Sequence, residues 1–171
     1  MLTTIQNNAR AVVKIDKTNG IVEKTFLGHD EDNVRERFET EIKILKYLES
    51  KGCDFVPKLI EFDEESFFVK TSYMGESLGE IDIAEHRKIH NRLIAFGVTH
   101  NDAVINPDLF SPPIIERLKT EKVETNEDGD YLVTYTAITP NPQIINAPKN
   151  LVVDDKGQIN VIDFERAVLD E

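Results

Sequence analysis

Two oxygen-bearing side chains flank a hairpin-like segment near the end of the sequence. Asn150 precedes the apolar run 151–153, and Asp163 follows the apolar run 159–162. The Asp-Asp-Lys-Gly turn at 154–157 lets the two runs pair as antiparallel strands, which brings Asn150 and Asp163 to the same end of the hairpin. Amide and carboxylate oxygens suit a hard cation, so the pattern predicts a magnesium site there.

A second carboxylate that could do chemistry lies upstream, at Asp102 in the sequence His100-Asn101-Asp102. A catalytic carboxylate combined with a magnesium site is typical of phosphoryl transfer.

Elements before residue 79 are the ones that would face these groups. Residues 11–15 and 21–26 read as two strands, joined by an Asn-Gly turn at 17–20. Apolar residues at spacings of three and four predict a helix over 34–50, with Gly52 as its left-handed cap. An acidic loop is expected at 28–32.

The remaining elements are read more coarsely. Residues 55–62 are expected to be extended and 66–71 to form a strand. The glycine-containing segment 73–79 reads as a connector between two lobes. A helix is expected over 82–96, with Ile83, His90, Leu93 and Ile94 near its inner face. Within the proline-rich stretch 103–149, residues 113–122 are read as a helix and 131–138 as a strand.

Composition and net charge limit the kinds of partner and the cellular location that we expect for this protein. The chain has 171 residues and a net charge of −12, so its summed field repels nucleic acids and anionic membranes. There is no apolar run long enough to cross a bilayer and no secretory signal, and the single Cys53 excludes an internal disulfide. We therefore expect a cytoplasmic protein with no nucleic-acid or membrane partner.

Taken in order, these features resemble the protein-kinase-like superfamily and its compact branches. Those branches include small atypical serine/threonine kinases, aminoglycoside phosphotransferases and lipopolysaccharide kinases. The residues that carry the resemblance are His-x-Asp at 100–102, Asn150 and Ile-Asp-Phe at 162–164. The resemblance implies an α+β, minimal protein-kinase-like fold. It would have an N-terminal sheet lobe at 1–79 with one helix and a truncated C-terminal lobe at 80–171.

The resemblance also implies roles for residues of the N-terminal lobe. Lys24 matches the strand lysine that holds the α- and β-phosphates of ATP, and Glu41 matches the helix glutamate that pairs with it. Glu39 is the alternative partner, but it lies on a different helix face. Tyr73 and Met74 occupy the position of the connector whose backbone contacts adenine.

Further roles implied by the resemblance lie in the C-terminal lobe. Asp102 matches the aspartate that accepts or orients the proton of the substrate hydroxyl. Asn150 and Asp163 match the two magnesium ligands. Asn106, four positions after Asp102, competes with Asn150 for the amide role.

Three departures from the family pattern qualify the resemblance. The expected phosphate loop, at residues 5–11, has no glycine. Asn150 follows Asp102 by 48 positions, whereas the family spacing is about five, so residues 103–149 read as an insertion. Glu165 replaces the usual glycine after Asp-Phe, and only six residues follow it. We expect the insertion, a partner chain or another mode of substrate binding to replace the missing floor of the lower lobe.

The sequence therefore predicts an ATP- and magnesium-dependent kinase acting on a hydroxyl, with protein serine or threonine slightly preferred over a small molecule. The alternative is a catalytically weak, pseudokinase-like nucleotide-binding or interaction module. The charged pair Glu36-Arg37 is expected to be an ordinary part of the surface.

Overall fold

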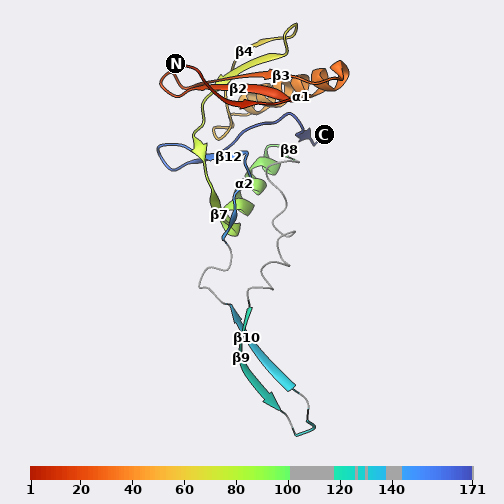
Figure 1. Cartoon of the computed structure of the whole chain (residues 1–171), viewed down its shortest axis with the longest axis vertical. Coiled ribbons are helices and arrows are strands. Elements are labelled where there is room, and N and C mark those ends of the chain that lie inside the picture. Colours follow the sequence, from red (N-terminus) through yellow and green to blue (C-terminus); the bar gives the residue numbers. More distant parts are fainter. Residues whose placement is uncertain (101–117, 126, 130, 138–143, 171) are drawn as a thin grey trace.

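A computed structural model of the chain describes residues 1–100, 118–125, 127–129, 131–137 and 144–170. The fold is α+β, and the described residues form small antiparallel sheets and two α-helices (Figure 1). The expected α+β class is confirmed at this level.

A five-stranded antiparallel sheet forms the N-terminal part. Its order is β1-β2-β3-β5-β4, with β1 at Thr3–Asn7, β2 at Ala11–Asp16, β3 at Ile21–Phe26, β5 at Phe68–Ser72 and β4 at Leu59–Asp63. The hairpin of β2 and β3 confirms the expected pair, and Gly20 takes the positive φ of 66° that its turn requires.

Strand β1 was not expected, because residues 5–11 were read as a loop. Residues 5–7 belong to this strand, and the turn after it is confined to residues 8–10. All five side chains of β1 are exposed, so the sequence carries no alternation of buried and exposed residues that could reveal it.

Helix α1 spans Glu31–Ser50 and packs beneath the sheet (Figure 1). It begins three residues earlier than expected because the Asp30 carboxylate accepts hydrogen bonds from the N–H groups of Asp32 and Asn33. Gly52, with φ of 74°, follows the helix as expected.

Two apolar clusters form the core, and α1 contributes to both. Its first half packs against the sheet through Val34, Phe38 and Ile42. Its second half, including Leu45 and Leu48, packs against the C-terminal part of the chain. Because one helix is shared by both clusters, it ties the sheet to the elements that follow.

The described residues of the C-terminal part form short strands and one helix. A sheet of order β13-β12-β6 joins Ile159–Val161, Leu151–Val153 and Glu76–Ser77, so the predicted terminal hairpin is confirmed. Strand β7 (Glu80–Asp82) pairs with β11 (Ile144–Asn146), and β8 (Val98–Thr99) pairs with β14 (Val168–Leu169).

Helix α2 spans Ile83–Ala95, close to the expected 82–96. Ile83 and Leu93 are buried as expected, and His86 and Ile89 are buried with them, whereas Ile94 is 40% exposed and His90 is only partly covered. The expected inner face is therefore confirmed at Ile83 and Leu93 and wrong at His90 and Ile94.

Strands β9 (Leu118–Thr125) and β10 (Tyr131–Ala137) form a separate hairpin. Figure 1 draws this hairpin at the bottom of the view and the large sheet at the top. The strand expected at 131–138 is confirmed over 131–137. The helix expected at 113–122 is wrong for residues 118–122, which are strand, and residues 113–117 lie outside the described part. Within the described ranges, neither helix is long and apolar enough to cross a membrane.

Candidate functional site

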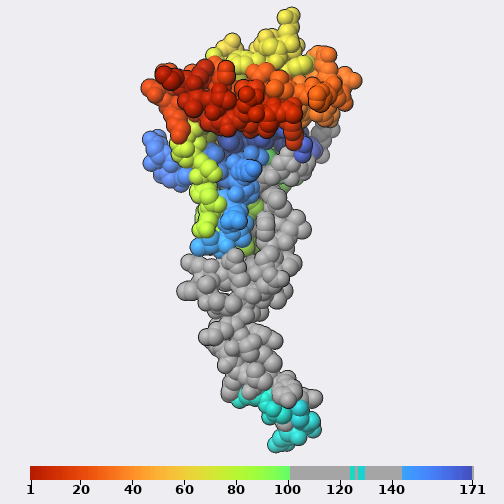
Figure 2. Space-filling model, in the orientation of Figure 1, coloured from red at the N-terminus to blue at the C-terminus, as the bar shows by residue number. Residues whose placement is uncertain are grey.

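A cavity of about 890 Å³ lies between the large sheet and the terminal hairpin. Its apolar lining comes from both sides, with Val13, Val22 and Val69 on the sheet and Val152 and Ile162 on the hairpin. Figure 2 shows the sheet stacked against the connector and the hairpin that enclose this space. A cavity of this size, with an apolar lining and a few charged residues, can accommodate a ring attached to a charged group. We call the apolar side of this cavity the slot.

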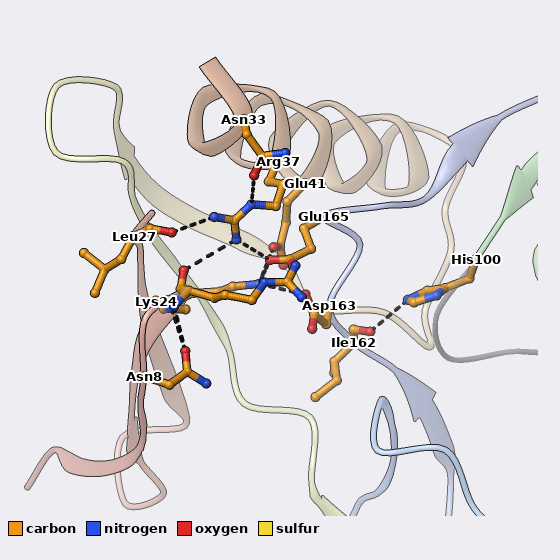
Figure 3. Close-up of polar contacts among 12 residues, drawn as sticks. Asn8, Lys24, Leu27, Asn33, Arg37, Glu41, His100, Ile162, Asp163 and Glu165 are labelled. Carbon is orange, nitrogen blue, oxygen red and sulfur yellow. Dashed lines mark hydrogen bonds and ion pairs between the residues drawn. The ribbon is translucent and has the colours of Figure 1, made fainter. Parts of the chain in front are cut away.

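Lys24 lies at the polar end of the cavity and is surrounded by carboxylates. Its Nζ is 2.9 Å from Glu41 Oε2, 2.7 Å from Asp163 Oδ1 and 3.1 Å from Glu165 Oε2 (Figure 3). The lysine comes from β3, Glu41 from α1 and the other two acids from the segment after β13. The structure therefore brings Lys24, Glu41 and Asp163 together, while Glu39 is exposed.

Burial and the three acids act in opposite directions on Lys24, whose side chain is only 13% exposed. Burial alone would lower the pKa of Lys24, but attraction to Glu41, Asp163 and Glu165 outweighs it, so the pKa of this ammonium is raised. Burial raises the pKa of Glu41, and the nearby carboxylates of Asp163 and Glu165 add to the rise. The lysine therefore stays charged and fixed in position.

The terminal hairpin places Asp163. Leu151 pairs with Val161, and the Ile162 N–H then donates to the Asn150 carbonyl at 2.9 Å. Asp163 has a φ of 65°, a left-handed conformation that lets the chain leave the ladder at this point. Its neighbour Phe164 is fully buried and anchors the turn.

His100 supports the same turn from the other side. Its Nε2 lies 3.1 Å from the Ile162 carbonyl oxygen, and its ring packs against Phe164 with centroids 5.0 Å apart. His100 is 2% exposed, so its contacts here are structural.

The oxygen ligands near the hairpin fit a hard cation. Asp163 is 37% exposed and lines the cavity together with Asn150. Ligand oxygens of Glu41, Asp163 and Glu165 lie within 4.8 Å of one another. Glu41 is buried against Lys24, so Asp163 with Asn150 is the accessible pair, and an all-oxygen set is what magnesium requires.

Glu165 and Arg37 were missed as site residues. Glu165 is 10% exposed and is contacted by Arg37 Nη1 at 3.6 Å and by Arg10 Nη2 at 2.8 Å. The expectation that Arg37 is a surface residue is wrong, because its side chain is buried and also donates to the Leu27 carbonyl at 2.6 Å. Helical spacing could have indicated that Arg37 is buried, because position 37 lies on the same inner face of α1 as Val34 and Glu41.

The connector borders the apolar end of the cavity. Tyr73 N–H donates to the Gly20 carbonyl at 2.8 Å, and the buried Asn160 side chain donates to the Met74 carbonyl at 2.8 Å. No described residue accepts a hydrogen bond from the Met74 N–H. This N–H and the Tyr73 carbonyl are therefore among the backbone groups available beside the slot.

Other expected site residues lie outside the described part of the chain. These are Asp102 and its neighbours, together with the competing amide Asn106. The described geometry therefore covers the lysine, helix and hairpin groups of the expected site.

No protein-family model matches this sequence, and comparison with curated proteins gives no significant match.

Proposed function

We propose that this chain is an ATP- and magnesium-dependent phosphotransferase with a minimal protein-kinase-like fold. The observation that carries the proposal is Lys24, held between Glu41 and Asp163 at 2.9 and 2.7 Å, at the polar end of an apolar cavity. A strand lysine, a helix glutamate and a post-hairpin aspartate in this arrangement have the functions that phosphoryl transfer requires.

Each residue would have a defined task in the proposed reaction. The apolar walls and the backbone of Tyr73 and Met74 would bind the adenine ring. Lys24 would hold phosphate oxygens, and Asp163 with Asn150 would hold magnesium, which neutralises developing charge on those oxygens when it is bound. Asp102 would accept or orient the proton of the attacking hydroxyl.

The proposed substrate is a hydroxyl, with a protein serine or threonine slightly preferred over a small molecule. The net charge of −12 disfavours an acidic acceptor, because a like-charged substrate is repelled at long range. A basic protein or a neutral sugar fits this charge better. Residues 103–149 or a partner chain would supply the surface on which the substrate is bound.

The proposal is tested by ATP turnover and autophosphorylation in wild-type protein and in two variants. Asp102→Asn and Asp163→Asn should each lower turnover by about 100-fold or more. Asp155→Asn, in the exposed turn of the same hairpin, is the matched control and should keep wild-type turnover. Full activity in Asp163→Asn would contradict the magnesium assignment.

A second candidate function is a pseudokinase-like nucleotide-binding or interaction module. It is favoured by the three carboxylates around Lys24, which leave this lysine little net positive charge to offer a phosphate. Binding of Mg-ATP by a pure preparation with no turnover for any hydroxyl substrate tested, including the protein itself, would favour this candidate over the first.

A further inference from the structure

Among the described residues at the polar end of the cavity, three acids face three cations, and Arg10 is the most exposed of these cations. Glu41, Asp163 and Glu165 face Lys24, Arg37 and Arg10. The side chains of Lys24 and Arg37 are 13% and 7% exposed and each contacts several fixed partners. Arg10 is 51% exposed and lines the same cavity.

Most backbone amides of the β1–β2 turn that carries Arg10 are already hydrogen-bonded within the turn. The Asn8 side-chain oxygen accepts hydrogen bonds from the N–H groups of Arg10 and Ala11, at 2.8 and 3.0 Å. In a glycine-rich loop such amides face the phosphates, but here the N–H groups of Asn8, Arg10 and Ala11 are already used. A ligand phosphate at this turn would therefore bind mainly through a side-chain donor.

Arg10 is built as such a donor. Its carbonyl accepts from the Leu27 N–H at 2.8 Å and from Arg37 Nη1 at 3.5 Å, so the backbone is held in place while the guanidinium end reaches into the cavity. A guanidinium can bind two phosphate oxygens at once.

Glu165 does not depend on Arg10. Its Oε1 accepts from Arg10 Nη2, whereas its Oε2 faces Lys24 at 3.1 Å and Arg37 at 3.6 Å. If Arg10 turns away, Glu165 keeps two buried cations. Arg10 can therefore leave the Glu165 carboxylate for a phosphate, and Glu165 is not left as an unpaired buried charge.

We propose that Arg10 binds the terminal phosphates of the nucleotide in place of glycine-rich-loop amides, and that Glu165 holds the guanidinium when no phosphate is present. This inference rests on the proposed nucleotide-binding function and names the residue that gives the site its preference for a triphosphate over a bare nucleoside.

The test compares the dissociation constants of Mg-ATP and adenosine by calorimetric titration. In Arg10→Ala, Mg-ATP should bind about 10- to 100-fold more weakly, and adenosine should bind as in the wild type. Arg10→Lys should fall between the two, because it keeps the charge but not the paired donors. Lys14→Ala is the matched control: Lys14 is an exposed cation of the adjoining strand β2 and is not among the residues that line the cavity, so its loss should leave the ratio of the two constants unchanged.

Two results would overturn the role of Arg10 alone: Mg-ATP affinity within twofold of wild type in Arg10→Ala, or an equal loss for Mg-ATP and adenosine. A third result, wild-type protein that binds neither ligand, would overturn the proposed function itself and Arg10's role with it. Unfolding of each variant without ligand shows whether a lost affinity reflects a damaged fold.

Discussion

At the scale of single residues, Lys24 joins three separate parts of the chain. One ammonium group in β3 meets a carboxylate of α1 and two carboxylates that follow β13. Removal of a buried charge that balances others leaves the remaining charges uncompensated. The consequences should appear in both stability and ligand binding.

Lys24→Met should lower the free energy of unfolding by about 3–5 kcal/mol, because three carboxylates then share a buried site without their cation. Since the pKa of Lys24 is raised in the folded state, its stabilising contribution is complete below the ordinary lysine pKa of 10.5 and is lost as pH rises through the higher folded value. Urea unfolding of both proteins should therefore show a constant difference from neutral pH up to 10.5, and a shrinking one above it. A difference that grows as pH rises toward 10.5 would show that the folded pKa of Lys24 is lowered instead.

Glu41→Gln should behave differently from Lys24→Met. Burial disfavours the charged form of Glu41, and Lys24 still contacts Asp163 and Glu165 when Glu41 is replaced. The free energy of unfolding should therefore change by no more than about 1 kcal/mol. Mg-ATP affinity should fall about tenfold because Lys24 loses the partner that positions it.

The exposed Glu39, two positions away on α1, provides the control for this change. Glu39→Gln should leave both the free energy of unfolding and the Mg-ATP affinity at wild-type values. Equal effects of the two substitutions would show that overall acidity, and not the Lys24–Glu41 contact, controls binding.

Sequence reasoning at this scale identified local groups better than long-range contacts. Lys24, Glu41 and Asp163 each carry a signal in their own strand, helix or hairpin. The contacts of Arg10 and Arg37 with Glu165 join segments far apart in the sequence, so no local pattern could report them. Only the helical spacing of Arg37 hinted that it is buried.

At the scale of elements, the connector and the hairpin make an unusually close contact at Gly75. This residue has a φ of 129°, and an added Cβ would lie 2.1 Å from the Val153 carbonyl oxygen. Only glycine permits the connector to approach β12 so closely, and this approach sets the apolar end of the cavity.

Gly75→Ala should therefore lower the free energy of unfolding by roughly 3 kcal/mol or more, because it combines backbone strain with overpacking. Gly79→Ala is the matched control, since Gly79 also has a positive φ, of 76°, but nothing lies within 4 Å of an added Cβ. Its cost should be about 1 kcal/mol. Equal costs, measured by chemical denaturation, would show that strain alone accounts for both.

Element prediction succeeded where apolar runs are bounded by clear turn residues. The β2–β3 and β12–β13 hairpins have apolar runs and clear turns, and both were expected. Strand β1 is exposed throughout and gave no such signal. Residues 118–122 contain helix-favouring Leu, Lys and Glu, but they pair with β10 instead, so tertiary pairing overrides their local preference.

At the scale of the whole molecule, the cavity depends on the large sheet and the terminal hairpin, which lie at opposite ends of the sequence. The lining residues that the structure describes come from the large sheet with its adjoining loops, α1, the connector, the stretch 146–152 and the residues just after β13. Replacing residues 118–137 with a short Gly-Ser linker should therefore keep Mg-ATP affinity within about twofold of wild type. A loss of affinity beyond tenfold in a folded variant would show that this hairpin contributes to the nucleotide site.

The central claim is that Asp163 helps to bind Mg-ATP. Thermal unfolding of wild-type protein and of Asp163→Asn, each with and without Mg-ATP, tests this claim most directly. Asn tolerates the left-handed backbone at this position, where φ is 65°, so the variant removes charge without straining the turn. Wild-type protein should gain about 2.7 kcal/mol of stability at 100 times the dissociation constant, and only with magnesium present. Asp163→Asn should lose this gain, while Asp155→Asn keeps it. No stabilisation of wild-type protein by millimolar Mg-ATP, or an equal gain in Asp163→Asn, would contradict the account.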